Sequence, residues 1–292
     1  MRPFEEYNPI VHLVYFLSCS AVVMFFLHPV TVLLSLLGAL SLFFVRNGSA
    51  HGKSHLLFFV LFLALALLNP LFNHNGATVL LVINHNPVTL EAIVYGVFAA
   101  AMLIGVMYWF RSFSQIMSSD KLLYLFGGIS PKLALILSMA LRYIPLFTKQ
   151  AQRVNDTQKA MGLYREDNLI DNTRAGARVF SVMVTWALEN GIISADSMSA
   201  RGYGVGRRTR YTIYRFRAVD AVLLGGTLLL LGVVIAGAAA GALELRWYPT
   251  LALPTGGVLR TVTYTAYALL SFLPTILEIG ERIRWKCLQS RI

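Results

Sequence analysis

The sequence predicts an all-α polytopic membrane protein with about six transmembrane helices and a large cytoplasmic insert. Of its 292 residues, 57% are hydrophobic and only 13% are charged, whereas soluble domains average about 25% charged residues. The mean hydropathy is +0.63, and the apolar residues gather in runs close to the ~20 residues that a bilayer span needs. These observations exclude an ordinary soluble enzyme.

Six apolar runs give the expected spans, and a seventh does not fit. The seventh, residues 122–147, is interrupted at residues 127–131 by Gly-Gly-Ile-Ser-Pro, which leaves pieces too short to cross. We expect it to lie at the inner membrane surface, to re-enter the membrane, or to span it as part of a different helix count. Trp109, Trp247 and Trp285 lie near predicted interfaces, where amphipathic rings are enriched. The expected spans are residues 10–28, 30–45, 56–72, 90–110, 218–241 and 257–279.

Basic residues set the expected orientation, because Lys and Arg are enriched in cytoplasmic loops. The formal net charge is +11, and residues 142–217 hold 13 Lys or Arg against 6 Asp or Glu. The C-terminus is also basic, so both termini are expected in the cytoplasm. The resulting regions are an N-terminal transmembrane region 1–141, a cytoplasmic insert 142–217 and a C-terminal transmembrane region 218–292.

Within the insert, two helical patterns each end at a glycine. The first covers residues 144–161 before Gly162, and the second covers residues 174–201 before Gly202. Glycine past a helix end adopts the left-handed conformation that closes the last turn. Arg201, in the last turn of the second helix, is placed to pair with a partner carboxylate. The second helix also carries an apolar stripe at helical spacing, interrupted by one Asn: Val179, Met183, Trp186, Asn190 and Ile193.

Two interpretations of these helices remain open. Either they lie on the bilayer with Arg201 bound to lipid headgroups, or they dock on another protein. The insert is far longer than a connection between helices needs, and it carries mixed charges. Both features favour protein docking.

Four short strings occur in an order that is typical of one family. They are Asn-Pro-Leu-Phe-x-His-x-Gly-x-Thr at residues 69–78, Ala-Leu-Arg-Tyr-Ile-Pro-Leu at 140–146, Ser-Ala-Arg-Gly at 199–202, and Leu-Pro at 273–274 followed by Glu278 and Glu281. In this order, across about residues 60–285, the chain resembles the transmembrane T component, EcfT or CbiQ, of energy-coupling factor (ECF) transporters.

The resemblance implies a subunit that links two cytoplasmic ABC-type ATPases, identical or paralogous, to a small membrane substrate-binding protein, the S component. Coupling helices ending in Ala-Arg-Gly dock on the ATPases, and their apolar faces cradle the S component, which topples to release substrate inside. ATP hydrolysis belongs to the partners, so the chain itself is expected to be no enzyme and to need no cofactor. The cargo that the resemblance implies is a vitamin, or cobalt or nickel, and the implied location is a bacterial or archaeal cytoplasmic membrane.

Carried onto this sequence, the resemblance implies three groups of site residues. The first docking motif departs from the family pattern, because Met161 stands where the arginine is expected; Lys159 and Arg165 are the nearest cations. An asymmetric pair of docks suits two non-identical ATPases. The implied residues are Ala160, Met161, Gly162, Ala200, Arg201 and Gly202 for ATPase docking, Val179, Met183, Trp186 and Met198 for S-component contact, and Asn69, Pro70, His74, Arg142 and Pro145 for the structural motif.

Arg142 and Pro145 are expected at the start of the insert, where they fix its angle to the membrane. The alternative for Arg142 is an anchor to lipid phosphate, and membrane lipids are expected partners in either case. Nucleic acid is not expected.

Other sequence patterns give weaker functional evidence. Gly52-Lys53-Ser54 lacks the first glycine of a phosphate-binding loop. His74 and His85 near an outer loop have no carboxylate or Cys beside them, so no metal site is expected. Ionisable residues stay near span ends, which disfavours an ion-coupled carrier. The alternative function is a membrane enzyme acting on lipid or prenyl substrates at the inner surface, but the cytoplasmic acids form no DxxxD-type repeat.

Overall fold

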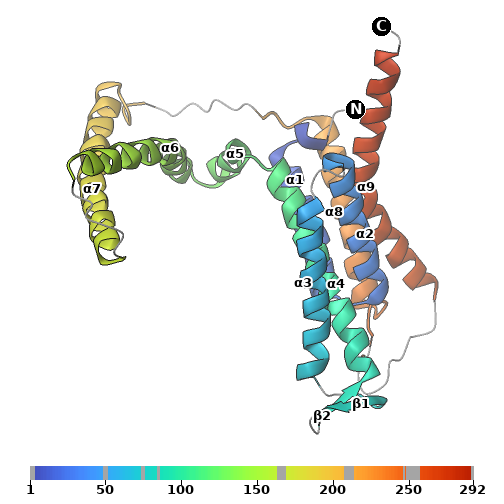
Figure 1. The fold of residues 1–292 in the computed structure, drawn as a ribbon. Coiled ribbons are helices and arrows are strands. Elements are labelled where there is room, and N and C mark those ends of the chain that lie inside the picture. Colours follow the sequence, from blue (N-terminus) through green and yellow to red (C-terminus); the bar gives the residue numbers. More distant parts are fainter. Residues whose placement is uncertain are drawn as a thin grey trace. The chain divides into compact units, whose positions relative to one another are not determined.

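The computed structural model describes residues 4–48, 52–73, 76–83, 86–162, 169–206, 214–245, 247 and 257–290, and helices dominate these residues (Figure 1). The predicted all-α class is therefore confirmed. The short hairpin β1–β2 was not predicted. In chain order the elements are η1 (Phe4–Glu6), α1 (Pro9–Phe25), α2 (Pro29–Asn47), α3 (Gly52–Phe72), β1 (Val79–Ile83), β2 (Asn86–Thr89), α4 (Leu90–Ile116), α5 (Ser119–Ile129), α6 (Pro131–Ala160), α7 (Leu169–Ala200), α8 (Ala218–Ala239) and α9 (Val258–Gln289).

The chain divides into two compact units. The bundle unit comprises Met1–Lys121 and Tyr214–Ile292, and the inserted unit is Leu122–Ile213. The bundle unit contains α1–α4, α8 and α9, and the inserted unit contains α6, α7 and most of α5. The inserted unit thus includes the Gly-rich segment before α6 as well as most of the insert expected at residues 142–217.

Six described helices are long and apolar enough to span a membrane: α2, α3 from His55 onward, α4, α6, α8 and α9. The number agrees with the prediction, but the membership differs. Helix α1 has 17 residues, about 26 Å at 1.5 Å per residue, which is at the short end for a span. Helix α6 qualifies by length, although none of its apolar window is buried.

The break predicted near residue 130 is confirmed, but its consequence is not. Helix α5 ends at Ile129 and α6 begins at Pro131, because proline fits the first helical turn, where its missing N–H is not needed. The second piece was expected to be too short to cross. It instead continues through Pro145 to Ala160, giving a helix of 30 residues.

Helices α4 and α9 organise the bundle. Helix α4 packs on α1, α2 and α3, and α9 packs on α2 and α8. Trp109 was expected at an interface and is instead fully buried in this core, where its Nε1 donates to Ser35 Oγ at 2.9 Å. The Tyr15 hydroxyl donates to the Leu270 carbonyl at 2.7 Å. These two buried polar side chains are therefore bonded between helices, which satisfies them within an apolar surrounding.

Small residues let α9 approach its neighbours closely. A Cβ added at Gly237 of α8 would lie 2.1 Å from Thr263 Oγ1, and one added at Gly38 of α2 would lie 2.9 Å from Ser271 Cβ. Both distances are well below van der Waals contact. Close backbone approach at small residues is the usual way in which membrane helices gain packing contacts.

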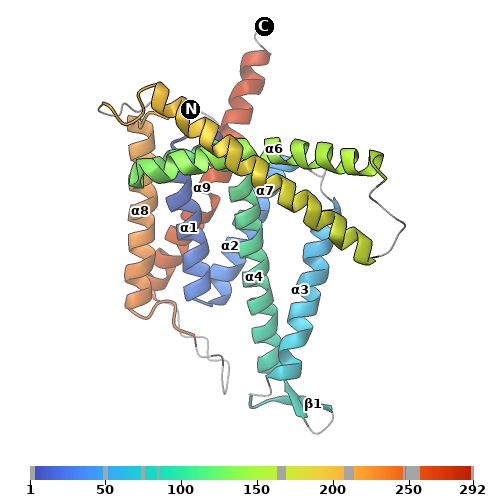
Figure 2. The ribbon, with the colours of Figure 1, turned by 90° about the vertical axis from the view of Figure 1, so that its left-hand side faces the viewer.

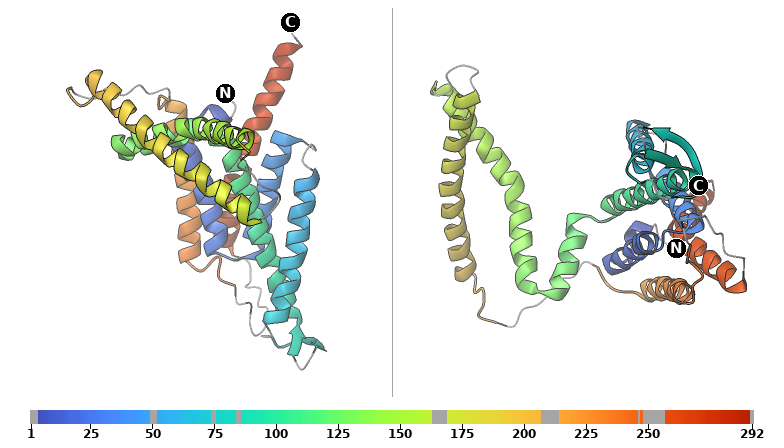
Figure 3. Two further views of the ribbon diagram at one scale, coloured as in Figure 1. Left: turned by 60° about the vertical axis from the view of Figure 1, so that its left-hand side comes forward. Right: turned by 90° about the horizontal axis from the view of Figure 1, so that it is seen from below.

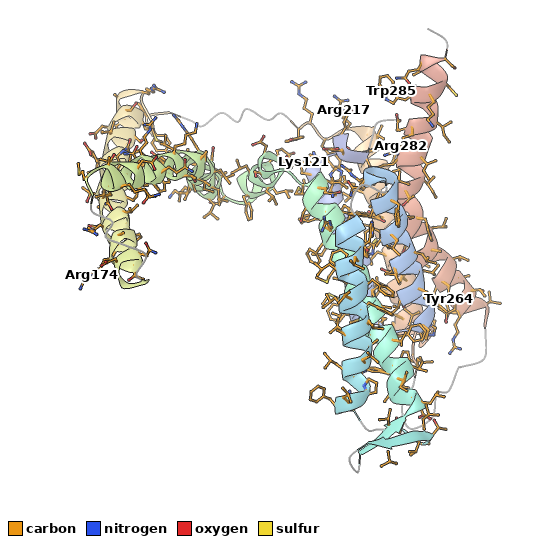
Figure 4. All side chains as sticks on the ribbon, viewed as in Figure 1. Lys121, Arg174, Arg217, Tyr264, Arg282 and Trp285 are labelled. Carbon is orange, nitrogen blue, oxygen red and sulfur yellow. The ribbon has the colours of Figure 1, made fainter. Side chains whose placement is uncertain are left out.

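The basic end of the bundle contains an ion-pair network. Arg46 at the end of α2 bonds Glu5 at 3.0 Å and Glu278 of α9 at 3.1 Å. Lys121, Arg217 and Arg282 lie at this same end of the bundle, whereas Tyr264 lies toward the other (Figure 4). Glu278 is thus paired with an arginine of another helix, 232 positions earlier in the sequence.

The hairpin β1–β2 lies at the opposite end of α3 and α4 (Figure 3). Its antiparallel strands pair Ile83 with Asn86 and Val79 with Thr89. In the inserted unit, α6 and α7 cross one another (Figure 2). The hydroxyls of Tyr143 on α6 and Ser194 on α7 are 2.7 Å apart at this crossing.

Candidate docking surface of the inserted unit

Helix α7 ends in a complete glycine-closed turn. The Gly202 amide donates to the Ser199 carbonyl at 2.9 Å, and the Tyr203 amide donates to the Met198 carbonyl at 3.0 Å. Gly202 has φ +81°, a conformation that side chains disfavour, so glycine is required there. These two bonds define a Schellman motif, in which Arg201 is the C-cap residue.

Helix α6 ends with a glycine of the same conformation and with the first of these two bonds. The Gly162 amide donates to the Lys159 carbonyl at 3.0 Å, and Gly162 has φ +67°. Met161 is the C-cap residue, and 69% of it is exposed. The predicted glycine stops are thus confirmed at both helices. The two Ala-X-Gly strings present their central residue at the same position of the same turn.

The two central residues differ in chemistry. The Arg201 side chain is exposed and forms no hydrogen bond or ion pair with any described residue, so among these residues nothing occupies its guanidinium. Met161 offers an apolar, flexible side chain instead. Lys159 lies two residues before Met161, and Arg165, the other nearby cation, falls outside the described residues.

Four of the five residues of the apolar stripe expected on α7 are half-buried, and its centre contacts α6, whereas Ile193 is 58% exposed. The ring of Trp186 packs against that of Phe147 at 5.4 Å between centroids. Asn190, which interrupts the stripe, donates its Nδ2 to the Trp186 carbonyl at 2.9 Å, so its polar group is satisfied within the helix. Val179, Met183 and Met198 lie on the same half-buried side.

A second apolar row on α7 is exposed. Phe180, Val184, Leu188 and Ile192 follow at four-residue spacing, which places them on one face, and Phe180 is 70% exposed. This row was missed in the sequence analysis, although its four-residue spacing could have identified it. A continuous exposed apolar row of this kind marks a protein or lipid contact.

Arg142 and Pro145 lie within α6, which continues through the expected start of the insert at residue 142. Both side chains are exposed, and the Arg142 side chain bonds no described residue. Its neighbour Tyr143 makes the hydroxyl contact to Ser194 and stacks on Phe147. The structure therefore places Arg142 beside the α6–α7 crossing.

The motif at residues 69–78 surrounds the start of α4. Thr78 donates its hydroxyl to Glu91 Oε2 at 2.8 Å and its amide at 3.3 Å. A Cβ added at Gly76 would lie 2.5 Å from Thr89 Oγ1, so only glycine fits against the hairpin. This pairing with Glu91 was missed, because nothing local in the sequence connects residues 78 and 91.

Asn69 and Pro70 lie in the last turn of α3. The Asn69 side-chain oxygen accepts from Asn73 Nδ2 at 2.7 Å, and a Cβ at Gly96 of α4 would lie 3.0 Å from Asn69 Cβ. The motif thus joins α3, the hairpin and α4. His74 and His85 fall outside the described residues. Within the described part, no three His, Cys, Asp or Glu residues gather into a metal-type cluster.

A family model described as CbiQ, cobalt transport protein, matches residues 2–212, which include α1–α7 and both Ala-X-Gly turns. The chain belongs to this family. It is therefore a membrane component of a transport system, and its apolar helices make it a multi-pass membrane protein.

The names of similar proteins are consistent with membership of the CbiQ family. The chain is 32% identical over 106 residues to the energy-coupling factor transporter transmembrane protein EcfT of Lacticaseibacillus paracasei, and 27% identical over 106 residues to that of Lactobacillus helveticus. Each match covers 36% of this chain and only 40% and 38% of the relative. A putative ABC transporter ATP-binding protein of Bifidobacterium longum is 24% identical over 219 residues, 72% of this chain and 25% of that protein.

Proposed function

We propose that this CbiQ-family chain is the energy-coupling transmembrane subunit of an ECF-type importer, and that residues 142–217 form its coupling region. The observation that carries the proposal is the shared geometry of the two Ala-X-Gly turns. Each turn ends a long exposed helix, is rigidly closed by glycine, and presents one side chain to solvent. Two such ends on one unit suit two similar partners.

The partners are two cytoplasmic ABC-type ATPases, which hydrolyse the ATP. Arg201 forms a charge-assisted bond to a carboxylate on one of them, a geometry for which the planar guanidinium is suited. Met161 makes an apolar contact with the other, so the two ATPases are non-identical. The similarity of this chain to a quarter of a protein named as ATP-binding supports such a partnership.

The third partner is a membrane S component that binds the cargo. Its contact surface is the apolar side of α7, including Val179, Met183, Trp186 and Met198, and the exposed row that begins at Phe180 extends this surface. The cargo is a vitamin, or a cobalt or nickel ion. Movement of α6 and α7 driven by the ATPases is transmitted to the S component.

The basic end of the bundle faces the cytoplasm, which places both termini inside a bacterial or archaeal cell. Lys121, Arg217 and Arg282 at that end support this orientation. Arg246, which follows α8 in the sequence, and Arg260, in the first turn of α9, are exceptions to the rule.

Affinity purification in mild detergent from the native host, followed by mass spectrometry, tests the proposal. The wild-type chain is expected to bring down two ABC-type ATPases and one or more small membrane proteins. Arg201→Glu is expected to weaken the binding of one ATPase by roughly tenfold or more, because a buried charge pair is lost. Arg174→Glu, at the other end of α7, is the matched control and is expected to retain both.

Two results would overturn the proposal. One is purification of the wild-type chain without any ATPase. The other is equal ATPase binding by Arg201→Glu and the wild type.

A further inference from the structure

The inserted unit leaves the bundle at a buried lysine. Lys121 is the last residue of the bundle unit on this side, and only 6% of it is exposed. Its Nζ donates to the Ile116 carbonyl at the end of α4 at 2.9 Å and to the Glu5 carbonyl of η1 at 2.6 Å. The start of α5 is thereby tied both to α4 and to the N-terminal segment.

The chain returns to the bundle at a buried aspartate. Asp220, in the first turn of α8, accepts from the Arg217 amide at 2.9 Å and from the Asn8 amide at 3.1 Å. The first bond satisfies a helix N-terminal donor in the way a capping residue does. The second bond spans 212 positions of sequence and ties the start of α8 to the N-terminal segment.

The N-terminal segment is itself firmly held. Phe4 is fully buried and packs edge-on against the rings of His12 and Tyr15. The Glu5 carboxylate bonds Arg46 of α2, which also bonds Glu278 of α9. Residues 4–8 therefore contact both crossing points of the chain and are anchored in the bundle core.

We propose that residues 4–8 act as a clamp that joins the two attachment points of the inserted unit, with Lys121 and Asp220 as its positioning residues. Every force that passes between the two units along the chain passes through these two points. Because both are bonded to the same short segment, they move together with the bundle. Motion of α6 and α7 is then transmitted to the membrane part and is not lost by fraying of α4 or α8. This consequence for transport rests on the proposed function.

Hydrogen exchange on the full chain in detergent tests the clamp directly. Lys121→Met is expected to raise exchange of the Asn8 amide by about tenfold, because the loss of charge-assisted bonds at one anchor loosens the shared segment. Asp220→Asn is expected to raise exchange of the Met117 amide, which donates to the Phe113 carbonyl at the end of α4. Asp120→Asn, exposed and adjacent to Lys121, is the control and is expected to change neither.

The proposal would be overturned if each variant raised amide exchange only around its own substituted residue. A purely local role for Lys121 or Asp220 would leave exchange at the other attachment point unchanged. Lys121→Arg keeps the donors and is expected to restore the wild-type exchange, which separates the clamp from general misfolding. This exchange result does not depend on any ATPase, so the clamp and the proposed function can fail separately.

A second readout uses the complete transporter reconstituted in liposomes. Lys121→Met is expected to lower the amount of substrate moved per ATP hydrolysed while the assembled complex keeps its ATPase activity. An unchanged ratio, or a loss of uptake that only follows a loss of assembled complex, would count against the clamp.

Discussion

Replacing Gly237 by alanine is expected to force α8 and α9 apart. The new Cβ would lie 2.1 Å from Thr263 Oγ1 and 3.0 Å from Thr263 Cγ2, so the two atoms must separate by more than 1 Å to reach ordinary contact. Thr263 is buried, and its hydroxyl donates to the Leu259 carbonyl at 2.8 Å. The side chain therefore has no open space into which it can turn without breaking that bond.

Gly232→Ala in the same helix isolates the steric effect, because a Cβ there meets no atom within 4 Å. Both variants gain the same helix propensity, so their difference measures the clash. Overpacking of this kind typically costs about 1–3 kcal/mol. We expect Gly237→Ala to have a free energy of unfolding lower than that of Gly232→Ala by this amount, measured by SDS titration of the purified chain in mixed micelles.

Adding Thr263→Ala to Gly237→Ala removes the two closest atoms and is expected to recover most of the loss. Equal stability of the two glycine variants, within about 0.5 kcal/mol, would refute the reasoning, since surface-like changes fall in that range. So would a double variant no more stable than Gly237→Ala alone.

Three further outcomes are expected. Thr78→Val should lower thermal stability because it removes the hydroxyl bond to Glu91, whereas Thr78→Ser should not; equal midpoints in a melting assay would contradict this. His28 accepts from the Val30 amide at the start of α2, and burial, followed by the charge of Arg260, lowers its pKa below 6.5. The neutral imidazole is favoured in the folded state, so stability should fall as pH drops below about 6.5 and His28→Gln should flatten that profile. Met161→Arg should leave ATPase co-purification intact or strengthen it, and complete loss of assembly would refute the asymmetric dock.

The sequence predicts the bundle better than the inserted unit, for a physical reason. Apolar runs mark spans because lipid requires them, and all six expected runs contain helices. Helix α6 was cut short because its polar half after Lys149 carries no hydropathy signal, although it continues the same helix. The position of Trp109 was wrongly predicted because an indole ring suits the membrane–water interface as well as it suits a core position next to Ser35.

The two glycine-closed turns could be predicted from the sequence, whereas the contacts made by the helix faces could not. Glycine at 162 and 202 marks a local conformation, which one residue can specify. Which face of α7 meets α6 depends on a neighbour distant in sequence, so the stripe through Trp186 could be found but not assigned. The contacts of Lys121 and Asp220 could not be predicted for the same reason. In the sequence, Lys121 is only a charge flanking a span, and Asp220 is only an acidic residue near a span end. Their shared partner segment lies more than 100 positions earlier.

The two glycine-closed turns separate the shape of each helix end from its chemistry. Gly162 and Gly202 fix the path of the backbone, and the residue before each glycine supplies the side chain that meets solvent. A substitution at Met161 or Arg201 can therefore exchange an apolar contact for a charged one without moving the main chain. Under the proposed function, the partner contacted by one helix end can therefore be changed at a single position while the other helix end stays as it is.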